Sequence, residues 1–185
     1  MRFLQKNIFH PSTVLFLHAI LRRKMKLWRT RYMTKILFIC HGNICRSPMA
    51  EFIMKDLVKK AGLEQEFLIE SAAASREELG NPVYPPARRK LAEHGISCTG
   101  KTARQLQNHD YEKFDLLIGM DRRNLRDMQT ICGRDFADKM RLLLDYTDHP
   151  GDVADPWYTG DFETTWRDVE AGCRGLLERI NRREA

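Results

Sequence analysis

The 185-residue sequence lacks an apolar run long enough to cross a bilayer. Residues 14–21 are apolar apart from His18, but a membrane-spanning helix needs about 20 such residues. Basic residues follow this run, whereas in a secretory signal they precede it, so a signal peptide is not indicated. Internal repeats and low-complexity tracts are also lacking. With 43% hydrophobic residues, the chain can form one domain with a sizeable core.

The first 33 residues contain no acidic side chain, but they contain eight Lys and Arg residues. The rest of the chain has 23 basic and 25 acidic residues, so the basic pI of 9.2 comes from this segment. We therefore interpret residues 1–33 as a basic N-terminal extension and residues 34–185 as the domain. Met33 resembles a natural start, which favours upstream sequence without a packed role. A transit segment or a membrane-surface helix is the less favoured alternative, and no nucleic-acid partner is expected.

One segment combines a cysteine and an arginine at a spacing typical of a phosphate-binding loop. Cys40 and Arg46 are separated by five residues, between an apolar run at residues 35–39 and a helical pattern at residues 48–59. Five residues can wrap around a tetrahedral anion so that backbone N–H groups point inward, and the following helix adds its positive N-terminal dipole. The same field favours the thiolate of Cys40, which makes it a nucleophile. The strand–loop–helix context is the one that such a motif requires.

Each residue type in the loop suits an anion-binding role. Gly42 is expected to take the positive φ of a tight nest. The amide of Asn43 can pin the loop from behind, and the planar fork of Arg46 fits two phosphoryl oxygens. Ser47 is expected to cap the helix, with Pro48 at the first position, and its hydroxyl can also point toward the sulfur. The predicted phosphate-binding residues are His41, Gly42, Asn43, Ile44, Cys45 and Ser47.

A cysteine that displaces an oxygen leaving group needs a proton donor, and Asp155 is the best candidate. It precedes Pro156 and two aromatic residues, and it follows the apolar run at residues 140–144. Loops at the carboxyl ends of parallel strands converge on one crevice, which would bring Asp155 close to Cys40. The alternative is that Asp155 only caps a turn, since Asp-Pro is common turn chemistry.

Apolar runs alternate with helical patterns along the chain. The predicted strands are residues 35–39, 67–72, 116–120 and 140–144, and the predicted helices are residues 48–59, 86–94, 122–131 and 162–181. Strands separated by helices favour parallel pairing with right-handed crossovers. The predicted fold is therefore α/β: a single domain with a four-stranded parallel sheet flanked by helices, in a flavodoxin-like three-layer arrangement.

Together these segments resemble the low-molecular-weight protein-tyrosine phosphatases. The run from Cys40 to Pro48 is similar to the signature of that family, and Asp155-Pro156 followed by aromatics is similar to its general-acid loop. The likeness covers the chain from Thr34 to the C-terminus. Shorter landmarks agree, at residues 71–73, 80–82, 103–106, 120–121 and 124–125.

The resemblance implies hydrolysis of phosphotyrosine, in a phosphoprotein or a small aryl phosphate, through a phosphocysteine intermediate. Cys40 would attack phosphorus, Arg46 would bind the phosphoryl oxygens, and Asp155 would act first as acid and then as base. Trp157 and Tyr158 would form the wall for the phenyl ring. No metal or other cofactor is implied, the partner would be a phosphotyrosine-containing protein or peptide, and the oligomeric state is not indicated.

Three departures from the family pattern bear on substrate preference rather than on chemistry. Glu77 and its neighbours stand in a loop where many relatives have a tryptophan, so one aromatic wall is missing. The usual tyrosine pair after the acid appears as Trp157 and Tyr158. Lys101 stands where many relatives have a histidine.

Five cysteines, with one needed as a thiolate, indicate a reducing compartment and hence a cytoplasmic location. Cys45 stands inside the loop, where a second thiol can trap an oxidised Cys40 as a disulfide. The alternative is that Cys45 is a small buried residue. The remaining cysteines, Cys98, Cys132 and Cys173, are expected in the core.

Other functions share part of this pattern. Arsenate reductases of the same fold relay oxidation through two further cysteines close together, but Cys98 and Cys132 are 34 positions apart. Protein-arginine phosphatases place threonine where this chain has Ile44, and the apolar residue favours phosphotyrosine. A non-catalytic anion or metal binder is a less favoured alternative. Its candidate ligands are Asp145, Asp148, His149, Asp152, Asp155 and Asp161.

Overall fold

Strand β1 (Thr34–Cys40) lies inside a four-stranded sheet with the strand order β2-β1-β3-β4. The computed structural model describes residues 33–183, so the predicted extension lies outside the described residues apart from Met33. Every strand pairing is parallel, as predicted. The other strands are β2 (Phe67–Ala73), β3 (Leu116–Gly119) and β4 (Met140–Leu142).

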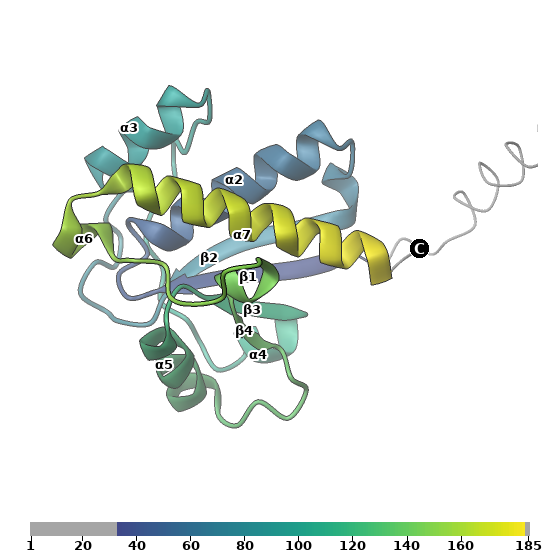
Figure 1. The fold of residues 1–185 in the computed structure, drawn as a ribbon. Coiled ribbons are helices and arrows are strands. Elements are labelled where there is room, and N and C mark those ends of the chain that lie inside the picture. Colours follow the sequence, from purple (N-terminus) through teal and green to yellow (C-terminus); the bar gives the residue numbers. More distant parts are fainter. Residues whose placement is uncertain (1–32, 184–185) are drawn as a thin grey trace, which may run out of the picture. The chain divides into compact units, whose positions relative to one another are not determined.

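Helices cover both faces of this sheet (Figure 1). Those on one face are α2 (Arg46–Lys60), α3 (Pro85–Glu93) and α7 (Phe162–Arg183). Those on the other face are α4 (Asp110–Lys113) and α5 (Arg122–Cys132). The remaining short elements are the 3-10 turns η1 (Glu64–Glu66) and η2 (Leu143–Tyr146) and the helix α6 (Pro156–Thr159). The predicted flavodoxin-like, three-layer α/β fold is confirmed.

The alternation of side chains along β1 builds both halves of the core. Ile36 and Phe38 pack in the cluster that contains the buried side of α2 and α7. Leu37 and Ile39 pack in the cluster that contains Met128 of α5. Because helices cover both faces, a central parallel strand is apolar on both sides. This explains why the whole run reads as hydrophobic.

The predicted element ends agree with the structure within two residues. The helix predicted at residues 48–59 begins earlier, at Arg46, and the fourth strand ends at Leu142 because η2 follows directly. None of the helices within residues 33–183 is both long enough and apolar enough to cross a membrane. The parallel arrangement brings the ends of β1 and β3 to the same edge of the sheet, where the predicted site residues follow.

Candidate active site

A pocket of about 280 Å³ opens at this edge of the sheet, where Cys40 is the last residue of β1. The predicted nucleophile, phosphate ligand and acid, Cys40, Arg46 and Asp155, all line it. The full lining is Cys40, His41, Gly42, Ile44, Cys45, Arg46, Glu77, Glu78, Asp121, Arg123, Asn124, Asp155, Trp157 and Tyr158. Four segments far apart in the sequence therefore meet at one crevice, as expected for the carboxyl ends of parallel strands.

The sulfur of Cys40 is buried at the start of the loop and has two polar neighbours. The backbone N–H of Asn43 donates to Cys40 Sγ over 3.3 Å. The hydroxyl oxygen of Ser47 lies 3.0 Å from the same sulfur. A sulfur that faces hydrogen-bond donors beside a helix N-terminus is stabilised as a thiolate. The predicted contact between Ser47 and the sulfur is therefore present.

The prediction that Gly42 supplies the positive φ is wrong. Asn43 has that conformation, with φ of 57°, and Gly42 is not in the left-handed region. Asparagine tolerates the left-handed region better than most side chains because it is short and bonds locally. A Cβ on Gly42 would lie 3.1 Å from Cγ of Glu78, so the Glu78 side chain would have to shift slightly to accommodate it.

Ser47 does not cap α2, contrary to the prediction. The helix begins at Arg46, the residue before it is Cys45, and no side chain caps the first turn. Ser47 lies within that first turn, where its hydroxyl faces Cys40 instead of the helix backbone. The free N–H groups of an uncapped helix start can bind an anion. The missing cap thus leaves the positive end of α2 available to the pocket.

The guanidinium of Arg46 is buried and holds two carboxylates. Its Nη1 donates to Asp121 Oδ2 at 2.6 Å and to the carbonyl of Val153 at 3.2 Å. Its Nη2 donates to Asp155 Oδ2 at 2.5 Å. Burial works against the charged guanidinium, but Cys40, Asp155 and Asp121 outweigh it, so the pKa of Arg46 is raised. Arg46 therefore carries a fixed positive charge at the wall of the pocket.

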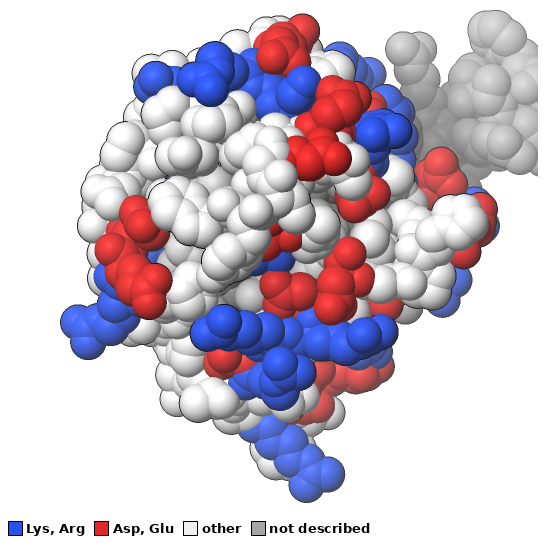
Figure 2. Space-filling model, turned by 60° about the vertical axis from the view of Figure 1, so that its left-hand side comes forward, with Lys and Arg blue, Asp and Glu red and all other residues white. Residues whose placement is uncertain are grey.

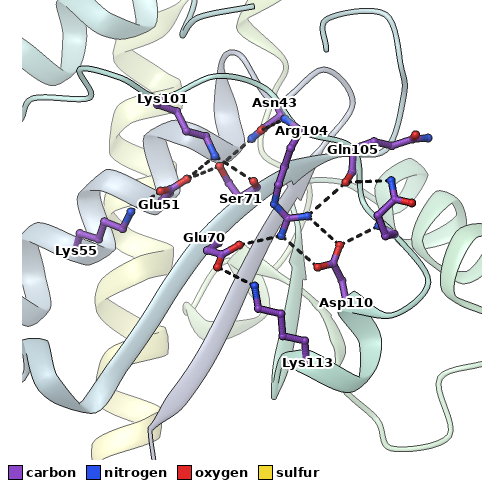
Figure 3. A network of polar contacts seen from close by, with 11 residues as sticks. Asn43, Glu51, Lys55, Glu70, Ser71, Lys101, Arg104, Gln105, Asp110 and Lys113 are labelled. Carbon is purple, nitrogen blue, oxygen red and sulfur yellow. Dashed lines mark hydrogen bonds and ion pairs between the residues drawn. The ribbon is translucent and has the colours of Figure 1, made fainter. Parts of the chain in front are cut away.

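A buried chain of hydrogen bonds supports the loop from behind (Figure 3). Asn43 Nδ2 donates to Ser47 Oγ and to Ser71 Oγ, each at 2.8 Å. Ser71 in turn donates to Glu51 Oε2 at 2.5 Å, because a carboxylate can only accept. Since Ser47 Oγ already accepts from Asn43, its own hydrogen is left to point at Cys40. The predicted pinning by Asn43 is present.

Glu51 is the buried anion at the far end of this chain. Lys101 forms an ion pair with it at 2.9 Å, and Lys55 forms a second one. Burial alone would raise the pKa of Glu51, but Lys101 and the hydrogen bonds from Lys55 and Ser71 outweigh it, so the pKa is lowered. Glu51 is thus held as a carboxylate, which fixes the direction of the Ser71 hydrogen bond.

Comparison with known proteins identifies the family to which this chain belongs. The family model described as "Low molecular weight phosphotyrosine protein phosphatase" matches residues 35–185. The chain belongs to this family.

Relatives of the phosphatase match over nearly their whole length. The chain is 40% identical to low molecular weight protein-tyrosine-phosphatase YfkJ of Bacillus subtilis, over 81% of this chain and 97% of that protein. It is 34% identical to the human low molecular weight phosphotyrosine protein phosphatase, over 79% of this chain and 95% of that protein. The crystal structure of YfkJ matches with a TM-score of 0.80 at 39% identity, covering 83% of this chain and 98% of that one. The expected enzyme class, a protein-tyrosine phosphatase, is thereby confirmed.

Aromatic and charged side chains form the rim of the phosphatase pocket. Trp157 and Tyr158 line it, and Trp157 packs against Tyr84 with ring centroids 5.2 Å apart. Elsewhere on the rim, Glu77 Oε2 is hydrogen-bonded to His41 Nε2 at 3.1 Å. Figure 2 shows acidic and basic side chains in separate groups across the face on which α6 comes forward. The rim therefore combines an aromatic wall with charges of both signs.

The second cysteine of the loop, Cys45, has a weakly acidic thiol. Burial raises the pKa of the Cys45 thiol strongly, and the neighbouring sulfur of Cys40 raises it further. Cys45 therefore stays a neutral thiol at physiological pH. The expected core cysteines, Cys98, Cys132 and Cys173, are buried and unbridged.

Several residues of the site were missed or assigned differently from the sequence. Asp121 lies two residues after the end of β3, and an acid just beyond a strand next to β1 was the available signal. Glu51 and Ser71 gave no such signal, because their contacts depend on the packing of α2 against β2. Lys101 does not line the pocket; it acts on Glu51 behind the loop. Within the described part of the chain, no three His, Cys, Asp or Glu side chains are placed to hold a metal ion.

Proposed function

We propose that this phosphatase hydrolyses phosphotyrosine through a phosphocysteine intermediate on Cys40. The observation that carries the proposal is the environment of the sulfur. Cys40 Sγ faces the Asn43 N–H and the Ser47 hydroxyl at 3.3 and 3.0 Å, in the same pocket as Arg46 and Asp155. Two-step phosphoryl transfer needs a stabilised thiolate as nucleophile, an arginine that binds the phosphoryl group and a carboxyl group that transfers protons.

In the first step, the Cys40 thiolate attacks phosphorus and a sulfur–phosphorus bond forms. The bond between phosphorus and the tyrosine oxygen breaks, and Asp155 gives its proton to that leaving oxygen. In the second step, Asp155 as carboxylate takes a proton from water, whose oxygen attacks phosphorus. The sulfur–phosphorus bond then breaks, and inorganic phosphate and the Cys40 thiolate are released.

Arg46 and the loop backbone would carry the negative charge of the phosphoryl group. Preorganised donors of this kind contribute roughly 3 to 4 kcal/mol each to transition-state stabilisation. The phosphate-binding set that we propose is His41, Gly42, Asn43, Ile44, Cys45, Arg46 and Ser47.

Asp155 and a phosphoryl group would compete for the same guanidinium nitrogen of Arg46, Nη2. Nη2 of Arg46 donates to Asp155 at 2.5 Å, while Nη1 is held by Asp121 at 2.6 Å. We infer that a phosphoryl oxygen takes over Nη2 and that Asp155 is thereby released toward the leaving oxygen. Asp121 would keep the guanidinium plane in place during this exchange, because it accepts its hydrogen bond from the other nitrogen, Nη1.

The preference for phosphotyrosine over phosphoarginine is supported by the apolar wall. Ile44 is buried in the loop, and Trp157 and Tyr158 offer aromatic faces for a phenyl ring. A phosphotyrosine-containing protein or peptide is the proposed partner, in the cytoplasm. We also propose the redox role of Cys45, whose sulfur would lose its proton and attack the sulfenic acid sulfur of an oxidised Cys40, so that a disulfide forms and the displaced hydroxide takes up that proton as water.

The proposed function is tested by Cys40→Ser. We expect loss of turnover with retained binding of inorganic phosphate, because backbone donors and Arg46 still form the cradle. Wild type and variant should be assayed in chelator with phosphotyrosine, phosphoarginine and phosphoserine peptides. Hydrolysis by Cys40→Ser within about tenfold of wild type would rule out the covalent mechanism, since a missing nucleophile costs far more. Faster hydrolysis of phosphoarginine than of phosphotyrosine would replace the proposed substrate.

A further inference from the structure

Residues 103–107 lie behind the phosphate-binding loop and form neither a helix nor a strand, apart from an isolated bridge at Gln105. Their backbone is attached to the end of β2. The N–H of Ala73 donates to the Arg104 carbonyl at 2.7 Å, and the N–H of Leu106 donates to the Ala73 carbonyl at 2.8 Å. On the other side, the N–H of Arg104 donates to Asn43 Oδ1 at 3.2 Å. Arg104 thus joins the edge of the sheet to the loop that carries Cys40.

The bond from Arg104 determines which way the Asn43 amide faces. A backbone N–H can only donate, so it selects the oxygen Oδ1 and leaves Nδ2 to face Ser47 and Ser71. If the amide were turned over, Ser47 would have to donate its hydrogen to Asn43. That hydrogen would then no longer be available to Cys40 Sγ. The orientation of one buried amide therefore controls the donor that faces the nucleophile.

The side chain of Arg104 holds this backbone in place through a two-pronged ion pair (Figure 3). Nη1 and Nη2 reach the two oxygens of Asp110 at 2.9 and 3.2 Å. Asp110 is only 2% exposed, and it also accepts from the Gln107 N–H at 2.8 Å. Its carboxylate thereby closes the turn from residue 104 to residue 110. A lysine could not make the same two parallel bonds, because its ammonium lacks the planar fork.

We propose that the Arg104–Asp110 pair positions the catalytic loop by holding the Arg104 N–H against Asn43, and so keeps the Ser47 hydrogen directed at Cys40. Neither Arg104 nor Asp110 lines the pocket, so both are positioning residues and neither touches the substrate. The proposal rests on the nucleophilic role that we propose for Cys40. It adds that the geometry of the loop is set by an ion pair on the far side of Asn43.

The test uses Arg104→Lys and Asp110→Asn. We expect kcat for an aryl phosphate to fall by about 10- to 100-fold in each, since a small misplacement of catalytic groups has effects of this size. KM should change by much less. Alkylation of Cys40 by iodoacetate, followed by mass spectrometry of its peptide, should slow at weakly acidic pH and stay unchanged at alkaline pH. The reason is that only the acidic condition requires the Ser47 hydrogen to hold the thiolate.

Lys113→Gln is the matched control. This variant breaks the 2.9 Å ion pair between Lys113 and Glu70, and that pair lies at the exposed end of the same network. The ion pair between Arg104 and Asp110 remains. Its kcat and its alkylation profile should equal those of wild type. In a Ser47→Ala background, Arg104→Lys should add little further loss, because it acts through the hydroxyl that is already absent.

Two results would overturn the proposal. One is a folded Arg104→Lys variant that has a lowered Tm but keeps the wild-type kcat and the wild-type ratio of acidic to alkaline alkylation rates. An ion pair with a purely structural role would give this result. The other is full additivity with Ser47→Ala. If Asp110→Asn does not fold, Arg104→Lys decides alone, since it keeps a cation opposite the buried carboxylate. Activity in Cys40→Ser would refute the proposed function instead, while the alkylation ratio would still report on the Ser47 hydrogen.

Discussion

The two carboxylate oxygens of Asp155 have different partners. Oδ1 accepts from the Trp157 N–H at 3.1 Å and so caps α6, while Oδ2 accepts from Arg46 at 2.5 Å. Turn capping and a place in the active site, which the sequence offered as alternatives, are therefore combined in one side chain. Pro156 at the first position of α6 leaves no N–H unpaired there, which suits a helix start next to a binding pocket.

Asp155→Asn should separate these two roles. The amide oxygen can still cap α6, but the side chain can no longer donate a proton to a leaving oxygen as an acid. We expect aryl phosphates with poor leaving groups to lose about 10²- to 10⁴-fold in kcat, and those with good leaving groups to lose far less. Rates across a series of substituted phenyl phosphates measure the difference. Equal losses throughout would leave Asp155 with only its capping role.

At the residue scale, the sequence predicted those site members that lie in contiguous motifs. Cys40, Arg46 and Asp155 could be located because spacing and a following proline mark them. Glu51 could not, because its contacts arise from the packing of α2 against β2, and Asp121 was overlooked although its place just after a strand was a signal. The positive φ was assigned to Gly42 on the general preference of glycine, whereas Asn43 has the left-handed conformation and Gly42 does not.

At the scale of elements, α7 crosses the turn η2 at two glycines. A Cβ on Gly175 would overlap the backbone carbonyl of Tyr146, and a Cβ on Gly172 would crowd the side chain of Leu143. Both glycines reduce helix propensity, yet they let the helix backbone approach η2 closely. This contact holds α7 against η2, which precedes the segment that carries Asp155.

Gly175→Ala should destabilise the phosphatase although it improves helix propensity. Alanine gains up to about 1 kcal/mol in an exposed helix, but overpacking against a rigid backbone atom costs about 1 to 3 kcal/mol or more. We expect a net loss of about 1 to 2 kcal/mol in the free energy of unfolding, measured in urea. Arg174→Ala, on the exposed side of the same helix, should stay within about 0.5 kcal/mol of wild type. An unchanged or higher stability of Gly175→Ala would mean that α7 moves away from η2 at no cost.

The strands and the long helices were predictable, whereas the short helices and turns were not. In each strand of four or more residues and each helix of nine or more, apolar residues recur in a pattern that the sequence shows. These residues pack in the core on one or both faces of the element. The short elements α4, α6 and η2 have too few residues for a period, and η2 was merged into the preceding strand. Their positions follow from individual side-chain contacts, such as the Asp110 carboxylate in α4 and the Asp155 cap of α6.

At the scale of the whole molecule, charge is divided unevenly along the chain. The eight basic residues before Thr34 have no acidic counterpart, while the domain that follows is close to neutral. The family match begins at residue 35, and all the proposed catalytic residues lie beyond it. Long-range attraction to an anionic surface is therefore expected of the first segment, whereas catalysis is expected of the second.

Removal of residues 1–32 should separate these two properties. We expect the shortened protein to fold and to keep kcat/KM for para-nitrophenyl phosphate within about twofold, because a domain with its own core folds independently. Retention on vesicles that contain anionic lipid should fall in the shortened protein, and for the full chain it should decrease as salt is added, since the attraction is electrostatic. Neutral vesicles provide the control. A tenfold loss of kcat/KM would place part of the catalytic apparatus in the extension, while equal vesicle binding by both proteins would assign membrane contact to the domain.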